Sequence, residues 1–383
     1  MAHYRLAVAS PLSLLTNEMV SLTETAHRLT LTGPFPFFKG AIMADAKLIG
    51  IDLGKYSFFV HAQDARGQQL WRRKFTRHQL IMMLAQHPPC TVAMEACAGA
   101  HWLARKLQSF GHQPRLITPQ FVKPFVKGNK TDFGDAQAIC ETASRPSMRF
   151  VAIKTPEQQT LLALHRVREA LVSERTATSN QIHAFLLEFG ISLPTGARAI
   201  ARLPALLDEP AHELPPRLIA TLLRLHRRYG QLGNEIAEIE TDLKAQLAED
   251  EAAQRLLTIP GIGPITASSL IAVIGDAHAF RHARDFAASL GLVPRQHSTG
   301  GRATLLGISK RGNAQLRSLL VQGARAVMRY IERRHDALGT WVQSLLRRRH
   351  SNVVACALAN KMARIVWAIL ARGGEYRAQP SPA

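Results

Sequence analysis

The chain of 383 residues is longer than one hydrophobic core usually organises, so we expect two or more domains. Its hydrophobic fraction of 46% is ordinary for a globular protein and argues against wholesale disorder. Lys and Arg number 48 against 28 Asp and Glu, a formal net charge of +20. Such an excess favours a polyanionic partner, nucleic acid above all, because binding releases counterions. Ribosomal or merely very soluble basic proteins share this composition, so charge alone leaves the partner open.

Residues 1–46 differ from the rest of the chain and form a predicted N-terminal extension without recognisable chemistry. They are poor in charge and include GPFPFF, a poor helix or strand, so we expect the extension to be poorly ordered. The extension lacks the basic, apolar and small-residue order of a signal peptide. Because Met43 directly precedes the first strand-like run, we interpret it as an appended tail or the product of a mis-chosen start codon.

Residues 47–150 are predicted to form an α/β domain of the ribonuclease-H-like type. Short apolar runs predict three strands in succession, and strands then alternate with helices. Strands are expected at 47–54, 56–63, 68–75, 90–96 and 114–119, and helices at 77–86, 100–110 and 121–126. Three antiparallel strands followed by alternating strands and helices are typical of this fold class.

Residues 151–250 are predicted to form an all-α arm or coiled-coil linker. Apolar residues recur at three- and four-residue spacing on both sides of a Pro- and Leu-rich stretch at 192–216. Two long helices joined by a loop suit dimerisation or reaching along DNA. A plain spacer bundle has the same pattern, and the sequence leaves that alternative open.

Residues 251–383 are predicted to form a basic, mostly α C-terminal domain. Arginines are dense between positions 281 and 349, where few acidic residues oppose them. The apolar stretch VVACALANKMARIVWAIL is interrupted by Lys361 and Arg364, which would be costly in a bilayer. We interpret it as a buried helix and expect no membrane. The cysteines, Cys90 and Cys97 near His101 included, lack a tight metal-binding pair and indicate inert thiols in a reducing cytoplasm.

Four acidic residues are candidate catalytic and metal-binding residues. Asp52 ends the first predicted strand, and Glu95 ends a later apolar strand, where a carboxylate is out of place unless it is bound or paired. Asp132 and Asp135 lie three residues apart at a predicted helix start, so both can face one way. Such a set could hold two Mg²⁺ ions for phosphoryl chemistry. Alternatively, Asp52 is a turn residue and Asp132 a helix cap, but their joint placement favours the metal site.

The segment LLTIPGIGPITASSLIAVIG resembles a helix-hairpin-helix motif. Its Gly261 and Gly263 would let backbone N–H groups approach a nucleic-acid phosphate without side-chain obstruction. An ordinary glycine turn between two helices is the alternative.

Ser298 is a candidate nucleophile in a predicted loop of small residues, HSTGGR. Arg295 and Arg302 flank it, and Lys310 with Arg311 follow, which gives the positive surroundings that attack on a phosphodiester needs. These residues would also fit a turn that only contacts phosphate, and the residues alone do not decide between the two.

Several motifs together resemble the transposases of insertion-sequence family 110, and its 1111 branch in particular. In chain order they are IGIDLGK, MEACAGAHW, KTDFGDA, TIPGIGPITA, GLVPRQHSTGG, ISKRGN and ANKMARIVWAIL. The resemblance covers roughly Lys47 to Tyr376, and the set of motifs is highly specific.

The resemblance implies a RuvC-like domain with a DEDD tetrad at Asp52, Glu95, Asp132 and Asp135, and a C-terminal serine transposase domain with Ser298. Recombination would join donor and target DNA, paired with a structured guide RNA encoded by the element. The acidic centre of one subunit would meet the serine of another, which implies a homodimer or homotetramer, and serine would form a 5′-phosphoserine link. Thr299 departs from the serine often found there and leaves open which hydroxyl attacks. A bacterial cytoplasmic, nucleoid-associated location follows.

Two other functions remain as alternatives. A RuvC-like structure-specific junction endonuclease needs only the acidic site and a basic surface. A non-catalytic nucleic-acid-binding protein needs only the charge and the hairpin motif. The acidic set argues against the second alternative, and the serine domain argues against the first.

Overall fold

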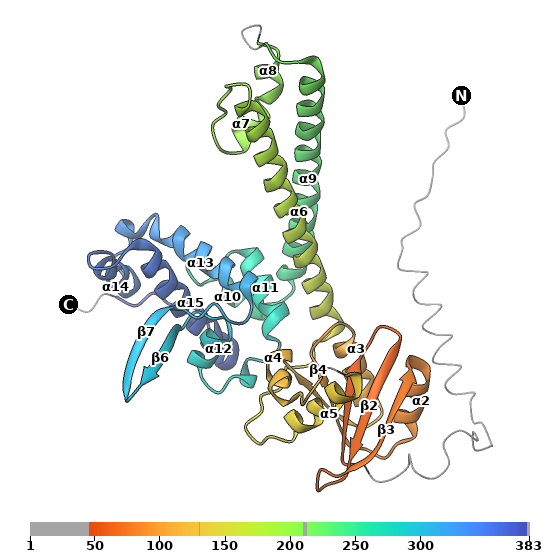
Figure 1. Cartoon of the computed structure of the whole chain (residues 1–383). Helices are drawn as coiled ribbons and strands as arrows, with labels where there is room; N and C mark the ends of the chain where they lie inside the picture. Colours follow the sequence, from red (N-terminus) through yellow and green to blue (C-terminus); the bar gives the residue numbers. More distant parts are fainter. Residues whose placement is uncertain (1–45, 130, 210–212, 381–383) are drawn as a thin grey trace, which may run out of the picture. The chain divides into compact units, whose positions relative to one another are not determined.

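The computed structural model describes residues 46–129, 131–209 and 213–380. The chain divides into two compact units, Met1–Val151 and Ala152–Ala383, and each is described by itself (Figure 1). The predicted extension at 1–46 lies outside the described residues except for Ala46, which is buried.

The first unit is built on a five-stranded sheet with the order β3-β2-β1-β4-β5. β2 is antiparallel to β1 and β3, whereas β4 is parallel to β1 and β5. The strands are β1 (Leu48–Leu53), β2 (Ser57–Gln63), β3 (Gln69–Thr76), β4 (Thr91–Glu95) and β5 (Gln113–Ile117). The predicted α/β class is confirmed for this unit.

Helices cover both faces of this sheet. The central strands carry apolar or small residues on both faces, so each face can bury a helix. Its helices are α2 (Arg77–Gln86), α3 (Ala100–Ser109), α4 (Pro119–Val122) with the 3-10 turn η1 (Lys123–Phe125), and α5 (Asp132–Ala143). α5 packs on the face that carries Gly50 and Ala93. The opposite face presents Ile49, Ile51 and Met94, which are fully buried beneath α2 and α3.

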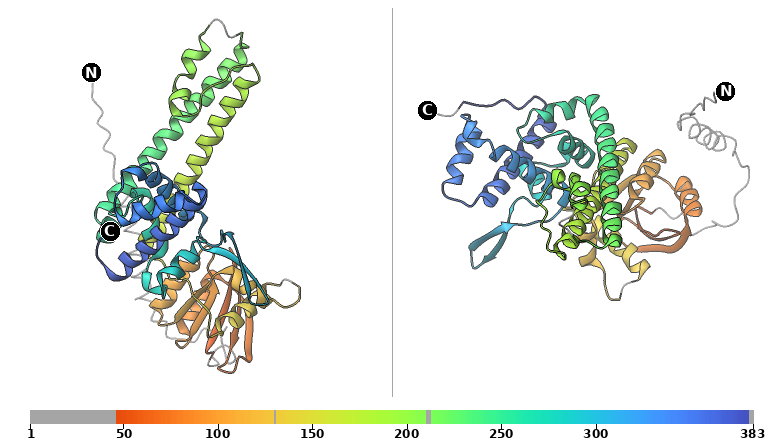
Figure 2. Two further views of the ribbon diagram at one scale, coloured as in Figure 1. Left: turned by 90° about the vertical axis from the view of Figure 1, so that its left-hand side faces the viewer. Right: turned by 90° about the horizontal axis from the view of Figure 1, so that it is seen from above.

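The second unit begins with an antiparallel pair of long helices, α6 (Pro156–Leu187) and α9 (Pro216–Ala248), seen clearly in Figure 2. Arg168 donates to Glu240 at 2.9 Å and Arg228 to Glu174 at 3.0 Å, so two ion pairs join the helices. At the far end the short helices α7 (Ala197–Ala201) and α8 (Leu203–Leu207) close a small apolar core.

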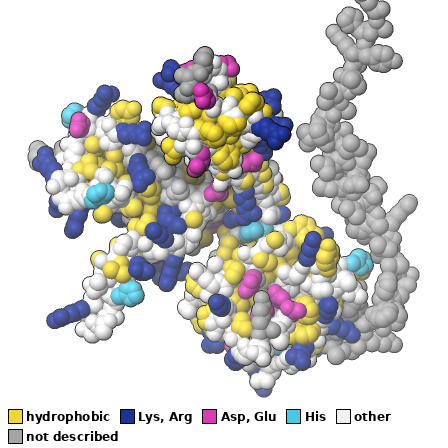
Figure 3. Space-filling view, turned by 45° about the horizontal axis from the view of Figure 1, so that its top comes forward, with side chains coloured by type: hydrophobic (Ala, Val, Ile, Leu, Met, Phe, Trp, Pro, Cys, Tyr) yellow, Lys and Arg dark blue, Asp and Glu magenta, His cyan; other side chains and the backbone are white. Residues whose placement is uncertain are grey.

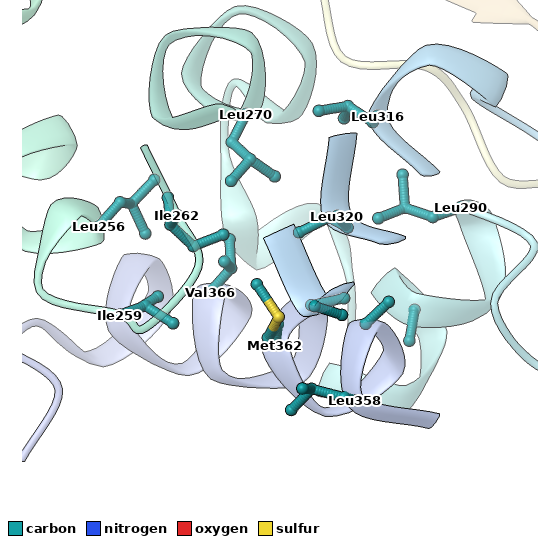
Figure 4. Close-up of a cluster of buried hydrophobic side chains, with 14 of the residues drawn as sticks. Leu256, Ile259, Ile262, Leu270, Leu290, Leu316, Leu320, Leu358, Met362 and Val366 are labelled. Carbon is teal, nitrogen blue, oxygen red and sulfur yellow. The ribbon is translucent and has the colours of Figure 1, made fainter. Parts of the chain in front are cut away.

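The rest of the second unit is mostly helical, as predicted. Its helices are α10 (Glu251–Leu257), α11 (Pro264–Ile274), α12 (Ala283–Ser289), α13 (Ala314–Met328), α14 (Ala337–Leu346) and α15 (Ser351–Arg372), with 3-10 turns η2 (Ala277–Ala279) and η3 (Ile331–Arg333). Figure 4 shows their shared core, in which Leu270, Leu320 and Met362 from α11, α13 and α15 meet. The helices of this core support the polar segments of the unit, which extend from it.

α15 is long and apolar enough, by length and composition alone, to cross a membrane. Its mean hydropathy reaches 1.7 over 18 residues, but one side of the helix lies inside the core with Leu358, Met362 and Val366. The core helix of a water-soluble unit has the same character.

A two-stranded antiparallel hairpin interrupts the helices of the second unit. It consists of β6 (Pro294–Thr299) and β7 (Arg302–Ile308), and nearly every residue in it is exposed. The prediction of a loop around Ser298 is therefore wrong, because that residue lies within β6. Isolated exposed hairpins are marginal on their own, and this one is held at its base, where Ser309 N–H donates to the Val293 carbonyl at 2.8 Å.

Candidate functional site

Asp52 and Glu95 lie side by side at the carboxyl ends of two parallel strands. Ile51 pairs with Met94, so the next residues along β1 and β4 are neighbours at the same edge. Side chains alternate along a strand, and Gly50 and Ala93 face α5. The carboxylates two residues further therefore lie on the α5 face as well.

α5 approaches the sheet closely because β1 carries a glycine beneath it. A Cβ at Gly50 would lie 2.4 Å from the Ala136 carbonyl oxygen and 2.6 Å from the Cys140 Sγ. Only glycine allows this contact without a shift of the helix. Asp132 lies one turn before Ala136 and Asp135 directly precedes it, so the same packing brings both acids over the end of β1.

The structure brings three of the four predicted acids into one group. Ligand oxygens of Asp52, Asp132 and Asp135 all lie within 4.8 Å of one another. Asp52 and Asp135 are half-buried, and Asp132 is exposed. Carboxylate oxygens at this spacing suit a hard divalent cation. Figure 3 shows acidic side chains gathered on one face of the first unit.

Glu95 is half-buried and adjoins this group through its position in β4, although the oxygens that lie within 4.8 Å come from the three aspartates. The charges of both Glu95 and Asp52 act on Cys97. Burial chiefly, and then these two carboxylates, raise the pKa of the Cys97 thiol, so the fourth acid contributes to the same electrostatic region.

The two structural alternatives for the acids are wrong. Asp52 is an internal residue of β1 rather than a turn residue. Asp132 begins α5, but the helix is capped by Thr131, whose hydroxyl accepts from the Gly134 N–H at 3.1 Å. The capping role that would explain an acid at this helix start is therefore already filled.

Basic side chains border the acidic group on the side of the edge strand β3. Asp52 pairs with Phe59, which pairs in turn with Lys74, so the three lie in one row across the sheet. The Phe59 ring meets Phe133 of α5 edge-on at 5.0 Å, and the Arg72 guanidinium lies 5.3 Å from the Phe133 ring. Sequence reasoning missed Arg72 and Lys74; strand alternation in QLWRRKFT was the available signal.

Ser298 lies in β6 near the end of the exposed hairpin. The Gln296 side-chain amide donates to the Ser298 hydroxyl oxygen at 2.7 Å, so these two side chains share one face. Thr299 pairs with Arg302, which places that arginine on the face of Thr299. Ser298 pairs with Ala303, so Arg302 projects from the other face of the hairpin, and the positive surroundings expected from Arg302 stay a prediction. Gln296 was missed because an amide carries no charge signal.

The other predicted basic residues spread along the hairpin and its base, and all are exposed. Arg295 lies at a register irregularity between Pro294 and Gln296. Lys310 adopts a left-handed conformation with φ of 56°, and its N–H donates to the Gly291 carbonyl at 3.1 Å. Arg311 follows it, where its carbonyl accepts from Arg317 at 2.9 Å.

The glycines of the predicted helix-hairpin-helix motif lie between α10 and α11, as expected. Gly263 caps α11 in extended backbone, and nothing would obstruct a side chain there. Gly261 packs against α13, because a Cβ there would lie 2.6 Å from the Gly323 carbonyl oxygen. Packing inside the protein therefore accounts for Gly261 without any ligand.

Comparison with known proteins agrees with the sequence motifs on both units. A model of DEDD transposases of the IS110 type matches residues 49–191, and a model of the IS116/IS110/IS902 transposase family matches residues 253–338. The two matches together span the acidic group and the hairpin. The chain is therefore a transposase, of a class whose DEDD domain indicates use of a divalent metal.

Curated relatives define the family more closely. The transposase of insertion sequence element IS1328 from Yersinia enterocolitica is 59% identical over 331 residues, which are 86% of this chain and 98% of the relative. That of IS1111A from Coxiella burnetii is 44% identical, over 88% and 92% of the two chains. A pilin gene-inverting protein of Moraxella lacunata is 26% identical, over 72% and 81%. The chain belongs to the IS110 family of insertion-sequence transposases.

Proposed function

We propose that this transposase cuts and rejoins DNA by phosphoryl transfer, with Ser298 as the nucleophile and Asp52, Glu95, Asp132 and Asp135 as ligands of two Mg²⁺ ions. A RuvC-like domain would comprise residues 47–150, a helical arm 151–250 and a serine transposase domain 251–383. An element-encoded guide RNA would pair with donor and target DNA. A homodimer or homotetramer would act in the cytoplasm at the nucleoid.

The convergence of Asp52, Asp132 and Asp135 within 4.8 Å carries this proposal. Like charges at such spacing repel one another, and a bound cation would offset that repulsion. When bound, divalent ions would neutralise the charge that develops on a phosphate during its displacement. The family relationship supports DNA as the substrate on which these carboxylates would act. The name of the Moraxella relative supports inversion of DNA segments as a related outcome.

The chemistry proposed for Ser298 balances as a transesterification. Its Oγ bonds to phosphorus and loses a proton to solvent, while the bond from phosphorus to the 3′ oxygen breaks and that oxygen takes up a proton. The DNA 5′ end stays on the serine as an ester, and attack by another 3′ hydroxyl releases it. The Gln296 amide occupies a lone pair of Oγ at 2.7 Å and leaves the hydroxyl proton available for removal.

Asp135→Asn tests the metal site directly. The variant keeps its size and helix position but removes one anionic ligand, so we expect Mg²⁺ affinity to fall about tenfold or more and DNA cleavage to be lost. Affinity is measured by calorimetry and cleavage on a supercoiled plasmid that carries the element ends. Glu141→Gln is the matched control, because Glu141 lies on the same helix and pairs with Arg145 at 3.2 Å. Equal Mg²⁺ affinity in the two variants would contradict the proposal.

A further inference from the structure

Two large aromatic side chains stand exposed at the edge of the sheet where the acids lie. Tyr56 is 76% exposed and Trp102 is 43% exposed. Tryptophan buries most of its surface in ordinary folds, so exposure of this extent needs an explanation. Neither residue takes part in the acidic group, and neither is used by the function proposed above.

Strand register places both residues at the carboxyl edge of the sheet. Leu53 at the end of β1 pairs with Phe58, and Tyr56 lies in the tight turn between them. Across this turn the Gly54 N–H donates to the Ser57 carbonyl at 3.1 Å. Trp102 lies in the first turn of α3, which follows the end of β4 after four residues. Asp52 is the penultimate residue of β1 and Glu95 the last residue of β4, so both acids lie at the same edge.

The loop between β4 and α3 joins the strand that carries Glu95 to the helix that carries Trp102. The Ala96 N–H donates to the Ile117 carbonyl at the end of β5 at 2.8 Å, and the Ala100 N–H donates to the Cys97 carbonyl at 3.2 Å. These hydrogen bonds hold the short loop at the carboxyl edge of the sheet, so the first turn of α3 begins there.

Each exposed ring has a cation beside it. The Lys55 ammonium lies 5.2 Å from the centre of the Tyr56 ring, and the Arg77 guanidinium lies 5.3 Å from the Trp102 ring and 5.4 Å from the ring of buried Phe58. Arg77 begins α2 directly after β3, whose end lies at the same edge because Ser57 pairs with Thr76. We name Lys55, Tyr56, Arg77 and Trp102 the aromatic edge.

We propose that the aromatic edge holds unpaired nucleobases at the same edge of the sheet as the acidic group, with Tyr56 and Trp102 stacking on bases while Lys55 and Arg77 contact the adjoining phosphates. This inference rests on the proposed function and adds that the strand is unpaired where it passes this edge. Every base has a flat π face, so an exposed ring with a cation beside it binds single strands with little sequence preference. In a duplex the bases stack on one another and offer no such face.

The test measures binding of the full chain to a 2-aminopurine-labelled single-stranded oligonucleotide in EDTA, so that no cleavage occurs. We expect Trp102→Ala to weaken single-strand binding about tenfold and to reduce the stacking-dependent quenching of 2-aminopurine, since one stacked base accounts for an effect of this order. Trp102→Phe should retain most of both signals. Tyr56→Ala should give a smaller loss in the same direction, and thermal unfolding of each variant checks that the fold is kept.

Tyr330→Ala provides a matched control from the second unit. Tyr330 is 60% exposed and has the Arg333 guanidinium 5.5 Å from its ring, so it combines the same chemistry within the other unit of the chain. We expect this variant to bind the single strand as the wild type does. Equal losses for Tyr330→Ala and Trp102→Ala, or unchanged single-strand binding in folded Trp102→Ala, would overturn the proposal. A loss of the same size for the duplex would overturn it too.

Two further experiments distinguish whether the strand is DNA or RNA, and whether the proposed metal site fails separately from the aromatic edge. The same sequence is tested as DNA and as RNA, and the larger loss in Trp102→Ala identifies which strand the edge holds. Asp135→Asn should keep the 2-aminopurine signal while it loses cleavage. Cleavage that survives in Asp135→Asn with stacking lost in Trp102→Ala would refute the metal site and leave the aromatic edge standing.

Discussion

The two units of the chain present their candidate chemistry in opposite ways. In the first, Asp52 and Glu95 extend from strands whose preceding residues are fully buried, and α5 is pressed onto the sheet through Gly50. In the second, Ser298 lies on an exposed hairpin whose base is closed by the hydrogen bond from the Ser309 N–H to the Val293 carbonyl. Carboxylates that share cations must keep fixed spacing, because like charges separate when their support yields. A nucleophile that must reach DNA benefits from a support that can adjust. The contrast predicts different responses to substitution.

The largest effect is expected from removing the hydroxyl of Ser298. Ser298→Ala should reduce strand exchange by about a thousandfold or more and abolish the covalent protein–DNA adduct, since a nucleophile in covalent catalysis has no substitute. The adduct is detected by denaturing electrophoresis with labelled DNA. Melting temperature should stay unchanged because the side chain is exposed. Thr299→Ala serves as the control and should retain the adduct.

If the adduct persisted in Ser298→Ala and were lost in Thr299→Ala, the nucleophile would be the hydroxyl of Thr299 rather than that of Ser298.

Asp52→Asn tests the acidic group of the first unit. It should disable cleavage, whether the protein is a recombinase or a junction endonuclease, and leave nucleic-acid binding intact. A junction endonuclease would continue to cut in Ser298→Ala.

A smaller effect is expected from filling the contact between β1 and α5. Gly50→Ala places a methyl group 2.4 Å from the Ala136 carbonyl oxygen, so the helix must shift. We expect a loss of about 1–3 kcal/mol in the free energy of unfolding, together with weaker Mg²⁺ binding. Gly230→Ala is the opposite case, because Gly230 is exposed within α9 and a Cβ there meets nothing within 4 Å. It should stabilise by about 0.5–1 kcal/mol without a change in Mg²⁺ binding.

Denaturant unfolding measures both glycine variants. If Gly50→Ala proved as stable as the wild type and bound Mg²⁺ equally well, the close approach of α5 would not be what fixes the acids.

A moderate effect of pH is expected in the second unit. His165 on α6 is buried and shares a hydrogen bond of 3.0 Å with Ser268 on α11, and burial lowers its pKa to about 4. The unfolded side chain has a pKa near 6.5 and takes up its proton first as pH falls. Stability from this group is thus complete above pH 6.5 and is lost from there down to about pH 4. Between pH 7.5 and pH 5 the loss is about 2 kcal/mol.

His165→Gln removes this titration, so the stability difference between variant and wild type should shrink by that amount as pH falls. Urea unfolding at the two pH values measures it. His278→Gln is the control, because His278 is exposed beside Asp276. A wild-type stability that falls no faster than that of His165→Gln would contradict the assignment.

The sequence predicted most of the first unit because its signals are local and redundant. Apolar runs marked each strand of the sheet, and an acid at the end of such a run stood out at Asp52 and Glu95. The KTDFGDA motif placed Asp132 and Asp135 on one helix. What the sequence could not reveal was how closely α5 packs, since that depends on Gly50 meeting a helix nearly ninety positions away.

The hairpin was missed for the opposite reason. PRQHST and RATLLGI bury almost nothing, so they lack the alternation that identifies a half-buried strand. The Gly300-Gly301 pair between them was the available signal for a tight turn. Tyr56 and Trp102 were also passed over, because exposure of an aromatic side chain is a property of the fold and leaves no mark in the residue type.

The reactivity of the Cys140 thiol can be used to measure whether α5 is packed on the sheet. Its thiol is fully buried, its pKa is raised to about 12 chiefly by burial, and it lies over Gly50. Alkylating reagents attack thiolates, so this cysteine stays inert while the helix is seated and reacts only when the helix lifts away. The rate at which Cys140 is labelled therefore reports how often the two aspartates of α5 leave their partners on the strands.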